Sequence, residues 1–175
     1  MTTANINDFK ANIAGGGARA NQFRVFLNTP SIATGLQPAG DSFLIKASSL
    51  PGQTITEIAI PFRGRNLYIA GDREFETWTT TVINETDFRI RNGIEKWMSG
   101  INDLETSTGV TDPALYYSQL RVEQLDRDNN LLKSYEMKNC WPTAISAIEL
   151  SYDTVSEVET FDVTWRYTHF SASSV

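Results

Sequence analysis

The chain has 175 residues, of which 41% are hydrophobic and 21% charged, as expected for one globular domain rather than a disordered chain. Its 21 acidic and 15 basic residues give a formal charge of −6, which argues against a protein that grips nucleic acid through a basic face. A single cysteine, Cys140, excludes an internal disulfide and a multi-cysteine metal site. We expect Cys140 to be a small buried core residue.

The first residues predict no export or membrane segment. Met1 to Asn5 lack the basic start and apolar stretch of a signal peptide, so we expect a cytoplasmic location. No apolar run approaches the roughly 18 residues of a membrane helix, so no stable membrane association is expected. Residues 1–20, with their glycines at 15–17, are expected to form a flexible arm that orders against a neighbour. Residues 21–175 are expected to form a single domain.

From residue 22 onward, apolar residues alternate with the period of two that is typical of β-strands. The first half of the domain predicts strands at 22–28, 42–47, 54–60, 66–70 and 76–84. Pro51-Gly52 predicts a type II turn, in which glycine takes the position that requires a positive φ. Arg63-Gly64-Arg65 predicts a tight link between the third and fourth strands.

The period then changes and predicts one amphipathic helix from Asp87 to Leu104, capped by Thr86 or Asp87. The helix is expected to cover the outer face of the core with the apolar residues Ile90, Ile94, Trp97 and Ile101.

Beyond the helix, residues 105–114 predict a loop, and further strands are expected at 119–127, 131–138, 144–152 and 159–170. In the last strand the residues expected to share one face are Phe161, Val163, Trp165 and Tyr167.

The sequence has few residues that could form a catalytic or metal site. The only histidine, His169, cannot build a common zinc site without cysteines, and it is expected to be a partly exposed strand residue. Asp126 to Asn130 resembles the start of a calcium loop, but Leu131 and Met137 stand where such a loop needs glycine and glutamate. A polar hairpin turn is the better interpretation. We therefore expect no catalytic residue, no metal site and no cofactor, and hence not an enzyme.

Acidic residues gather near the carboxyl end, without a basic residue until Arg166. They are Glu149, Asp153, Glu157, Glu159 and Asp162. Two interpretations stay open: a solvated strand and loop, or a surface that repels phosphate. The second matters only if DNA passes close to the protein.

Several short motifs, in order, carry a family resemblance. They are Ser49-Leu50-Pro51-Gly52, Pro61-Phe62-Arg63-Gly64-Arg65, Ala70-Gly71-Asp72-Arg73-Glu74-Phe75, Trp78-Thr79, Thr81-Val82-Ile83-Asn84, Trp141-Pro142-Thr143 and the run from Glu157 to Thr164. Together they resemble the tail tube proteins of contractile-tailed bacteriophages over most of residues 20–170. The chain departs from that pattern in its first 20 residues, at 30–41 and around 105–114.

The resemblance implies a mainly β fold: a β-sandwich or barrel-like domain with one amphipathic helix, whose strands join between subunits into a ring-shaped inner β-barrel. It implies hexameric rings that stack into a tube inside a contractile sheath and conduct double-stranded DNA. The implied partners are further copies, the tail sheath protein, and the baseplate and tail-terminator proteins. The implied location is the virion, after assembly in the host cytoplasm. Two alternatives remain: a tube subunit of a non-viral contractile injection or secretion system, and a small ligand-binding β-barrel.

The resemblance also implies roles for individual residues. The hairpin from Leu50 through Pro51 and Gly52 to Ile69 resembles the family's extended loop that reaches an adjacent ring. Arg63, Gly64 and Arg65 form its tip, where the arginines either pair with acids of the next ring or remain solvated.

Near the hairpin's end, Asp72 and Arg73 are expected to tie it to the domain by charge-assisted hydrogen bonds. The acids Glu157, Glu159 and Asp162 are the candidates for a negative field that lets DNA slide without sticking.

Overall fold

The computed structural model describes residues 5–13 and 17–174. The strands within these residues are β1 (Phe23–Leu27), β2 (Ile45–Ser48), β3 (Gln53–Phe62), β4 (Arg65–Phe75), β5 (Trp78–Ile83), β6 (Ser118–Leu125), β7 (Leu131–Ile145), β8 (Thr160–Arg166) and β9 (His169–Ser174). The helices are α1 (Ile6–Asn12), α2 (Pro38–Asp41), α3 (Arg89–Ile101) and α4 (Pro113–Tyr116), with a 3-10 turn at Ser42–Leu44. The predicted mainly β fold with one substantial amphipathic helix is confirmed.

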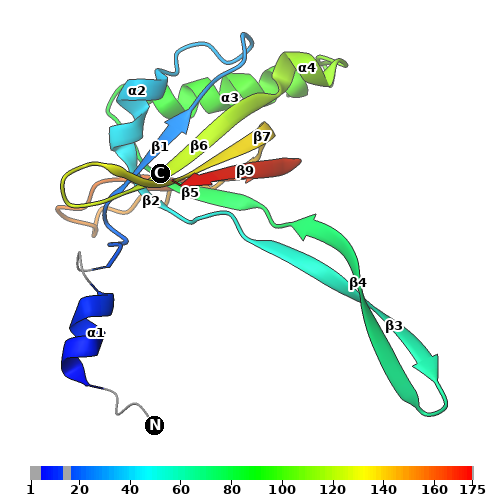
Figure 1. Cartoon of the computed structure of the whole chain (residues 1–175). Coiled ribbons are helices and arrows are strands. Elements are labelled where there is room, and N and C mark those ends of the chain that lie inside the picture. Colours follow the sequence, from blue (N-terminus) through cyan, green and yellow to red (C-terminus); the bar gives the residue numbers. More distant parts are fainter. Residues whose placement is uncertain (1–4, 14–16, 175) are drawn as a thin grey trace.

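A seven-stranded antiparallel sheet forms the body, in the order β1-β6-β7-β8-β5-β2, with β9 also paired to β7 (Figure 1). β7 connects the two halves of this sheet. Its first part pairs with β6 and β9, and its last residues, from Trp141 to Ile145, pair with β8. Asn139 takes a positive φ of 56° where β7 passes from one set of partners to the other. A single long strand therefore makes the body continuous.

Alternating strand residues and one helix face build the core. The expected face of β8 is confirmed, because Phe161, Val163 and Trp165 are all buried, as is Tyr167 just beyond the strand. The other buried apolar residues include Val25, Leu27, Trp78, Val82, Leu120, Val122, Met137 and Cys140. The burial predicted for Cys140 is confirmed, and burial raises the pKa of its thiol to about 12.

α3 covers this core, as its sequence period predicts. Ile90, Ile94 and Trp97 are buried, and the Trp97 ring lies 5.6 Å from that of Trp165. The Trp97 indole N–H donates to the carbonyl of Tyr116 at 2.9 Å, so the polar edge of this buried ring has a partner. Within the described residues no helix is long and apolar enough to cross a membrane.

A buried ion pair, which the sequence did not predict, fixes the start of α3. The Asp41 carboxylate is fully buried and binds the guanidinium of Arg89, which also pairs with Glu85 at 3.1 Å. The hydrogen bond to Asp41 raises the pKa of Arg89. Asp41 accepts a second hydrogen bond from the Gln37 backbone N–H at 2.7 Å. Removing Arg89 would leave the buried Asp41 carboxylate without a compensating charge, so the pair locks α2 against α3.

Several boundaries differ from those predicted. The type II turn at Pro51-Gly52 is wrong: the two residues lie in an irregular link, and Gly52 is not among the glycines with positive φ. The cap of α3 is also shifted, because Phe88 occupies the N-cap position with φ 53° while the Asp87 carboxylate accepts from the Arg89 N–H at 3.2 Å.

The carboxyl-terminal strands also differ from prediction. The strand predicted at 144–152 is wrong beyond Ile145, because residues 146–159 form a loop. The strand predicted at 159–170 is divided at Tyr167-Thr168 into β8 and β9, both of which pair with β7.

The predicted amino-terminal arm is described only in part. Residues 1–4 and 14–16 lie outside the described residues, and between them Ile6–Asn12 forms α1. The apolar side chains Ile6, Phe9 and Ile13 of this segment are all exposed. So short a helix is marginal in water, which agrees with an arm that orders against a neighbour. That expectation stays a prediction.

At Gly93 in α3, helix propensity and side-chain packing have opposite effects on the stability of an alanine variant. Alanine has a helix propensity about 1 kcal/mol better than glycine. A Cβ at Gly93 would, however, lie 2.6 Å from Cγ of Leu36, a branch atom that cannot move alone. Because overpacking typically costs about 1–3 kcal/mol, we expect Gly93→Ala to lower the free energy of urea unfolding. Asn92→Ala, at the exposed neighbouring position, should leave stability equal or higher; a Gly93→Ala protein as stable as Asn92→Ala would contradict the packing described.

Candidate assembly interface

The β3–β4 hairpin leaves the body of the protein and extends beyond it (Figure 1). Among the described strands, β3 and β4 pair only with each other, from Gln53 opposite Phe75 to Phe62 opposite Arg65. The tip is a two-residue loop in which Arg63 has φ 46° and Gly64 φ 81°. Two successive positive φ angles match the type I′ turn whose twist suits a hairpin. The predicted tight link at residues 63–65 is confirmed.

One face of this hairpin is apolar and open to solvent. Its members are Ile58, Ile60 and Phe62 on β3 and Leu67 and Ile69 on β4, with exposed fractions between 42% and 68%. Ile58 pairs with Ile69, and Ile60 with Leu67, so these side chains form one contiguous patch, which we call the apolar hairpin face. Fully burying an aliphatic or aromatic side chain is worth about 1.5–3 kcal/mol. A patch of this kind marks an interaction surface.

Aromatic contacts, rather than charges, join the hairpin to the body. The Phe75 ring lies 6.0 Å from the ring of Tyr167 and 5.5 Å from that of Phe170. The Tyr167 hydroxyl donates to the Gly52 carbonyl at 3.4 Å, which holds the other strand of the hairpin at the same level. The direction in which the hairpin projects is therefore set at its base.

Asp72 and Arg73 act inside the hairpin instead of tying it to the domain. Arg73 donates to the Gln53 side-chain oxygen at 2.9 Å, diagonally across the strand pair, since Arg73 lies opposite Ile55. The Asp72 carbonyl accepts from the Thr56 hydroxyl at 3.0 Å. In the described part of the chain neither residue forms an ion pair, so the predicted charge-assisted tie is replaced by the Phe75 contacts.

Leu50, Pro51 and Gly52 lie in the link between β2 and β3, where Leu50 is exposed. The Trp78 indole N–H donates to the Ser49 carbonyl at 2.7 Å, which fixes the start of this link on the body. The role of these three residues at a subunit contact stays a prediction.

The acids at the carboxyl end meet at one place. Glu157, Glu159 and Asp162 line, together with Glu149, a hollow of about 360 Å³ between the loop 146–159 and β8. The Asn84 amide donates to Glu159 at 2.8 Å, and the Thr81 hydroxyl to Asp162 at 2.6 Å. The structure thus brings together the acids singled out from the sequence.

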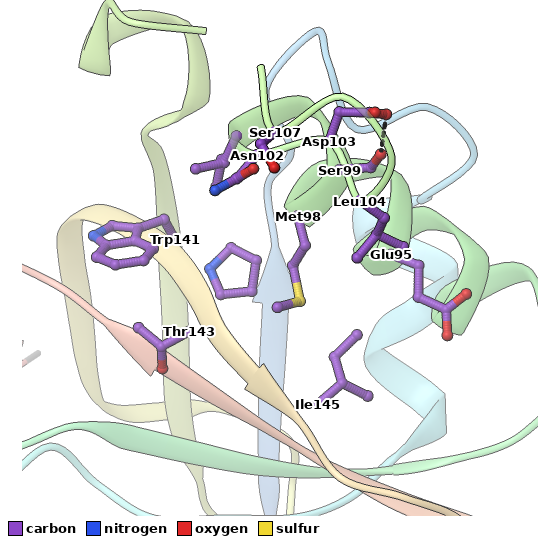
Figure 2. A pocket seen from close by; sticks show the side chains of 12 residues that line it. Glu95, Met98, Ser99, Asn102, Asp103, Leu104, Ser107, Trp141, Thr143 and Ile145 are labelled. Carbon is purple, nitrogen blue, oxygen red and sulfur yellow. Dashed lines mark hydrogen bonds between the residues drawn. The ribbon is translucent and has the colours of Figure 1, made fainter. Parts of the chain in front are cut away.

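A second hollow, of about 640 Å³, lies between the end of α3 and β7 (Figure 2). Its apolar wall includes Met98, Trp141 and Ile145. Asp103 stands at its rim, but the carboxylate accepts hydrogen bonds from the backbone and hydroxyl of Thr106. These bonds lower the pKa of Asp103, first through the Thr106 backbone N–H. This carboxylate therefore holds a turn and is a poor proton donor.

The remaining polar motifs have local structural roles. The predicted polar turn after β6 is confirmed, because the Asp126 carboxylate accepts from the N–H groups of Asp128 and Asn130, both at 2.8 Å. His169 lies exposed on β9, as predicted. Among the described residues, no group of three or more His, Cys, Asp or Glu side chains is placed to hold a metal ion.

Comparison with known proteins decides which family this architecture represents. A family model described as phage tail tube protein matches residues 18–173. The chain belongs to the phage tail tube protein family. The tail tube protein of Serratia phage KSP90 is 29% identical over 167 residues, which cover 94% of each chain. The tail tube protein of Enterobacteria phage T4 is 33% identical over 124 residues, covering 70% of this chain and 76% of that protein.

Solved structures extend the likeness of fold. A chain in the baseplate of the anti-feeding prophage superposes with a TM-score of 0.67 at 13% identity, covering 91% of this chain and 97% of that one. A chain in the sheath–tube complex of an extracellular contractile injection system gives 0.62 at 10% identity, covering 94% and 97%. The family's proteins are structural tail components, and the fold is shared with tubes of injection systems.

The apolar hairpin face is the feature that sequence reasoning missed. Its signal was present, because Ile58, Ile60 and Phe62 alternate along one strand and Leu67 and Ile69 along the next. In a sequence, such alternation looks the same whether the apolar face turns to the protein's own core or to another molecule.

A substitution at Gly71 tests whether close backbone packing maintains the shape of the hairpin. At the β3–β4 register shift, Gly71 and Asp72 of β4 lie opposite the single residue Thr56 of β3. A Cβ at Gly71 would lie 2.7 Å from the Thr56 hydroxyl and 3.0 Å from its carbonyl oxygen. We expect Gly71→Ala to accelerate amide hydrogen exchange several-fold within residues 53–75, while the α3 and β8 amides keep their protection. Ala70→Ser, on the opposite face, is the matched control; unchanged hairpin exchange in Gly71→Ala would refute the close contact.

Proposed function

We propose that this protein is the repeating subunit of the inner tube of a contractile phage tail. Its copies form hexameric rings, and the rings stack into a tube whose lumen conducts double-stranded DNA. The observation that supports this most is the apolar hairpin face, a two-stranded projection that cannot bury Ile58, Ile60 or Leu67 within its own chain. Isolated two-stranded hairpins are marginal in water, so this one requires a second copy.

Open sheet edges supply the second requirement for a ring. Among the strands that the structure describes, β2 pairs only with β5 and β9 only with β7. Each therefore has backbone N–H and C=O groups free to pair with a strand of a neighbour. Head-to-tail pairing of this kind closes into a ring when the rotation per subunit allows it. The continuous inner barrel is proposed to form in this way.

The outward face of β5 and β8 suits a lumen through which DNA slides. Thr79 lies opposite Thr164, and Thr81 opposite Asp162, so small hydroxyls and a carboxylate cover the centre of this face, which ends at Arg166. Such a surface presents few cations to the phosphate backbone. With Glu159 nearby, and a formal charge of −6, the field proposed for the lumen is negative.

The proposed partners follow from the same role. They are the tail sheath protein around the tube and the baseplate and tail-terminator proteins at its ends, in a virion assembled in the host cytoplasm. The solved structures with this fold come from baseplate, sheath–tube and terminator assemblies of injection systems, which supports such neighbours.

A non-viral contractile injection system is the second candidate, favoured by the fold shared with the anti-feeding prophage. Sequence identity favours the phage role, since the phage relatives are 29% and 33% identical and the injection-system chain 13%. Neighbouring genes discriminate the two: portal and capsid genes support the phage tail, and their absence beside sheath genes supports the injection system.

Electron microscopy of the purified protein at high concentration tests self-assembly. We expect rings with a central hole, or long uniform tubes. The double variant Ile60→Ser/Leu67→Ser should abolish stacking and leave the unfolding midpoint nearly unchanged, because both side chains are exposed in the monomer. Leu104→Ser/Leu115→Ser removes the same apolar groups from exposed sites elsewhere and should assemble normally.

Two outcomes would contradict this proposal. One is a wild-type protein that stays monomeric at millimolar concentration and also in the presence of its own tail's baseplate. The other is the formation of normal tubes by the Ile60→Ser/Leu67→Ser variant.

A further inference from the structure

The loop at residues 146–159 exposes apolar and acidic side chains together. Leu150, Val155 and Val158 are exposed, and Tyr152 is fully so. Glu149, Asp153, Glu157 and Glu159 stand among them, without a lysine or arginine. Its alternating apolar residues predict a strand, yet these four side chains are not among those that pack against the core within the described residues. We call this segment the acidic loop.

The tip of the β3–β4 hairpin has the complementary character. Phe62 is exposed, and the Arg63 guanidinium lies 5.4 Å from the centre of its ring. Arg65 lies opposite Phe62 and therefore on the apolar hairpin face. Between residues 58 and 71, Arg63 and Arg65 are the only charged residues. We call Phe62 to Arg65 the basic tip.

We propose that the basic tip of one copy docks on the acidic loop of a copy in the next ring. This inference rests on the proposed function and goes beyond it, because it names the surface that receives the hairpin. In Figure 1 the hairpin extends to the lower right while the acidic loop lies at the left side of the body. One chain therefore presents the two surfaces on opposite sides, as a repeating head-to-tail contact requires.

The hollow between α3 and β7 is a poorer receiver for two arginines. Of its two carboxylates, Glu95 already pairs with Arg91 at 2.9 Å, and Asp103 is held by Thr106. In the acidic loop, by contrast, Asp153 and Glu157 form no ion pair within the described chain. Charge complementarity thus selects the loop.

Apolar and charged contacts contribute differently to the proposed docking. Exposed ion pairs contribute little to binding, so Arg63 and Arg65 alone would bind weakly. Phe62 against the exposed Tyr152 and Val155 supplies most of the buried area. The charges fix the register and exclude wrong partners, since a like-charged surface would repel the tip. Once water is excluded, an arginine–carboxylate pair can become bidentate and stronger.

Charge reversal and its compensation test the docking. We expect Arg63→Glu/Arg65→Glu to reduce stacks of two or more rings at least tenfold while single rings persist. Asp153→Arg/Glu157→Arg should do the same. All four substitutions in one chain should restore stacking to within about threefold of wild type. Arg127→Glu, a reversal of an exposed arginine in the turn after β6, is the matched control and should stack normally.

Cross-linking gives a second, direct readout. Arg63→Cys and Val155→Cys are made in separate chains and mixed before assembly, and a short bismaleimide is added. The native Cys140 is buried, and its raised pKa keeps the thiol protonated and unreactive near neutral pH. We expect a covalent dimer of the two chains in tubes. Arg127→Cys mixed with Val155→Cys should give none.

The outcomes separate the two levels of inference. If the wild-type protein forms no rings or tubes, the proposed function fails and the docking fails with it. If wild-type tubes form but the four-fold variant does not restore stacking, or no 63–155 dimer appears, the docking is wrong while the tube role stands. Restored stacking together with the specific dimer supports the docking.

Discussion

The packing of Phe75 against Tyr167 and Phe170 is the contact on which the protein's outward organisation depends. It joins a long hairpin, which has no other layer behind it, to the end of the strand that also completes the core. Because Tyr167 is buried and donates to the Gly52 carbonyl, both strands of the hairpin are held to the body at its base. The body can thus present an apolar face at a defined distance without contributing to its burial.

Much of the body could be predicted from the sequence because its apolar residues face one shared core. The faces of β1, β8 and α3 follow directly from periods of two and of three to four. The strand prediction failed where alternating apolar residues do not face this core. Leu150 and Tyr152 alternate as in a strand, but the chain leaves the sheet after Ile145 and both side chains remain exposed.

The interface was partly predictable for a similar reason. The Arg63-Gly64-Arg65 tip has a turn signature that depends on local backbone conformation, so it could be placed from three residues. The anchor of the hairpin depends instead on Phe75 and on Tyr167 and Phe170, which lie far from Phe75 in the sequence. No local sequence pattern indicates that these three rings are in contact. The buried pair of Asp41 and Arg89 was missed for the same cause.

The proposed docking gives the assembly a direction, because the hairpin and the acidic loop lie on different sides of the body. A filament joined through two unlike surfaces has two unlike ends: one displays free hairpins, the other vacant loops. Growth at each end then obeys its own rate constants, and a protein that imitates only one of the surfaces can start or stop elongation at one end alone. The polarity of the whole filament would thus follow from the structure of a single subunit.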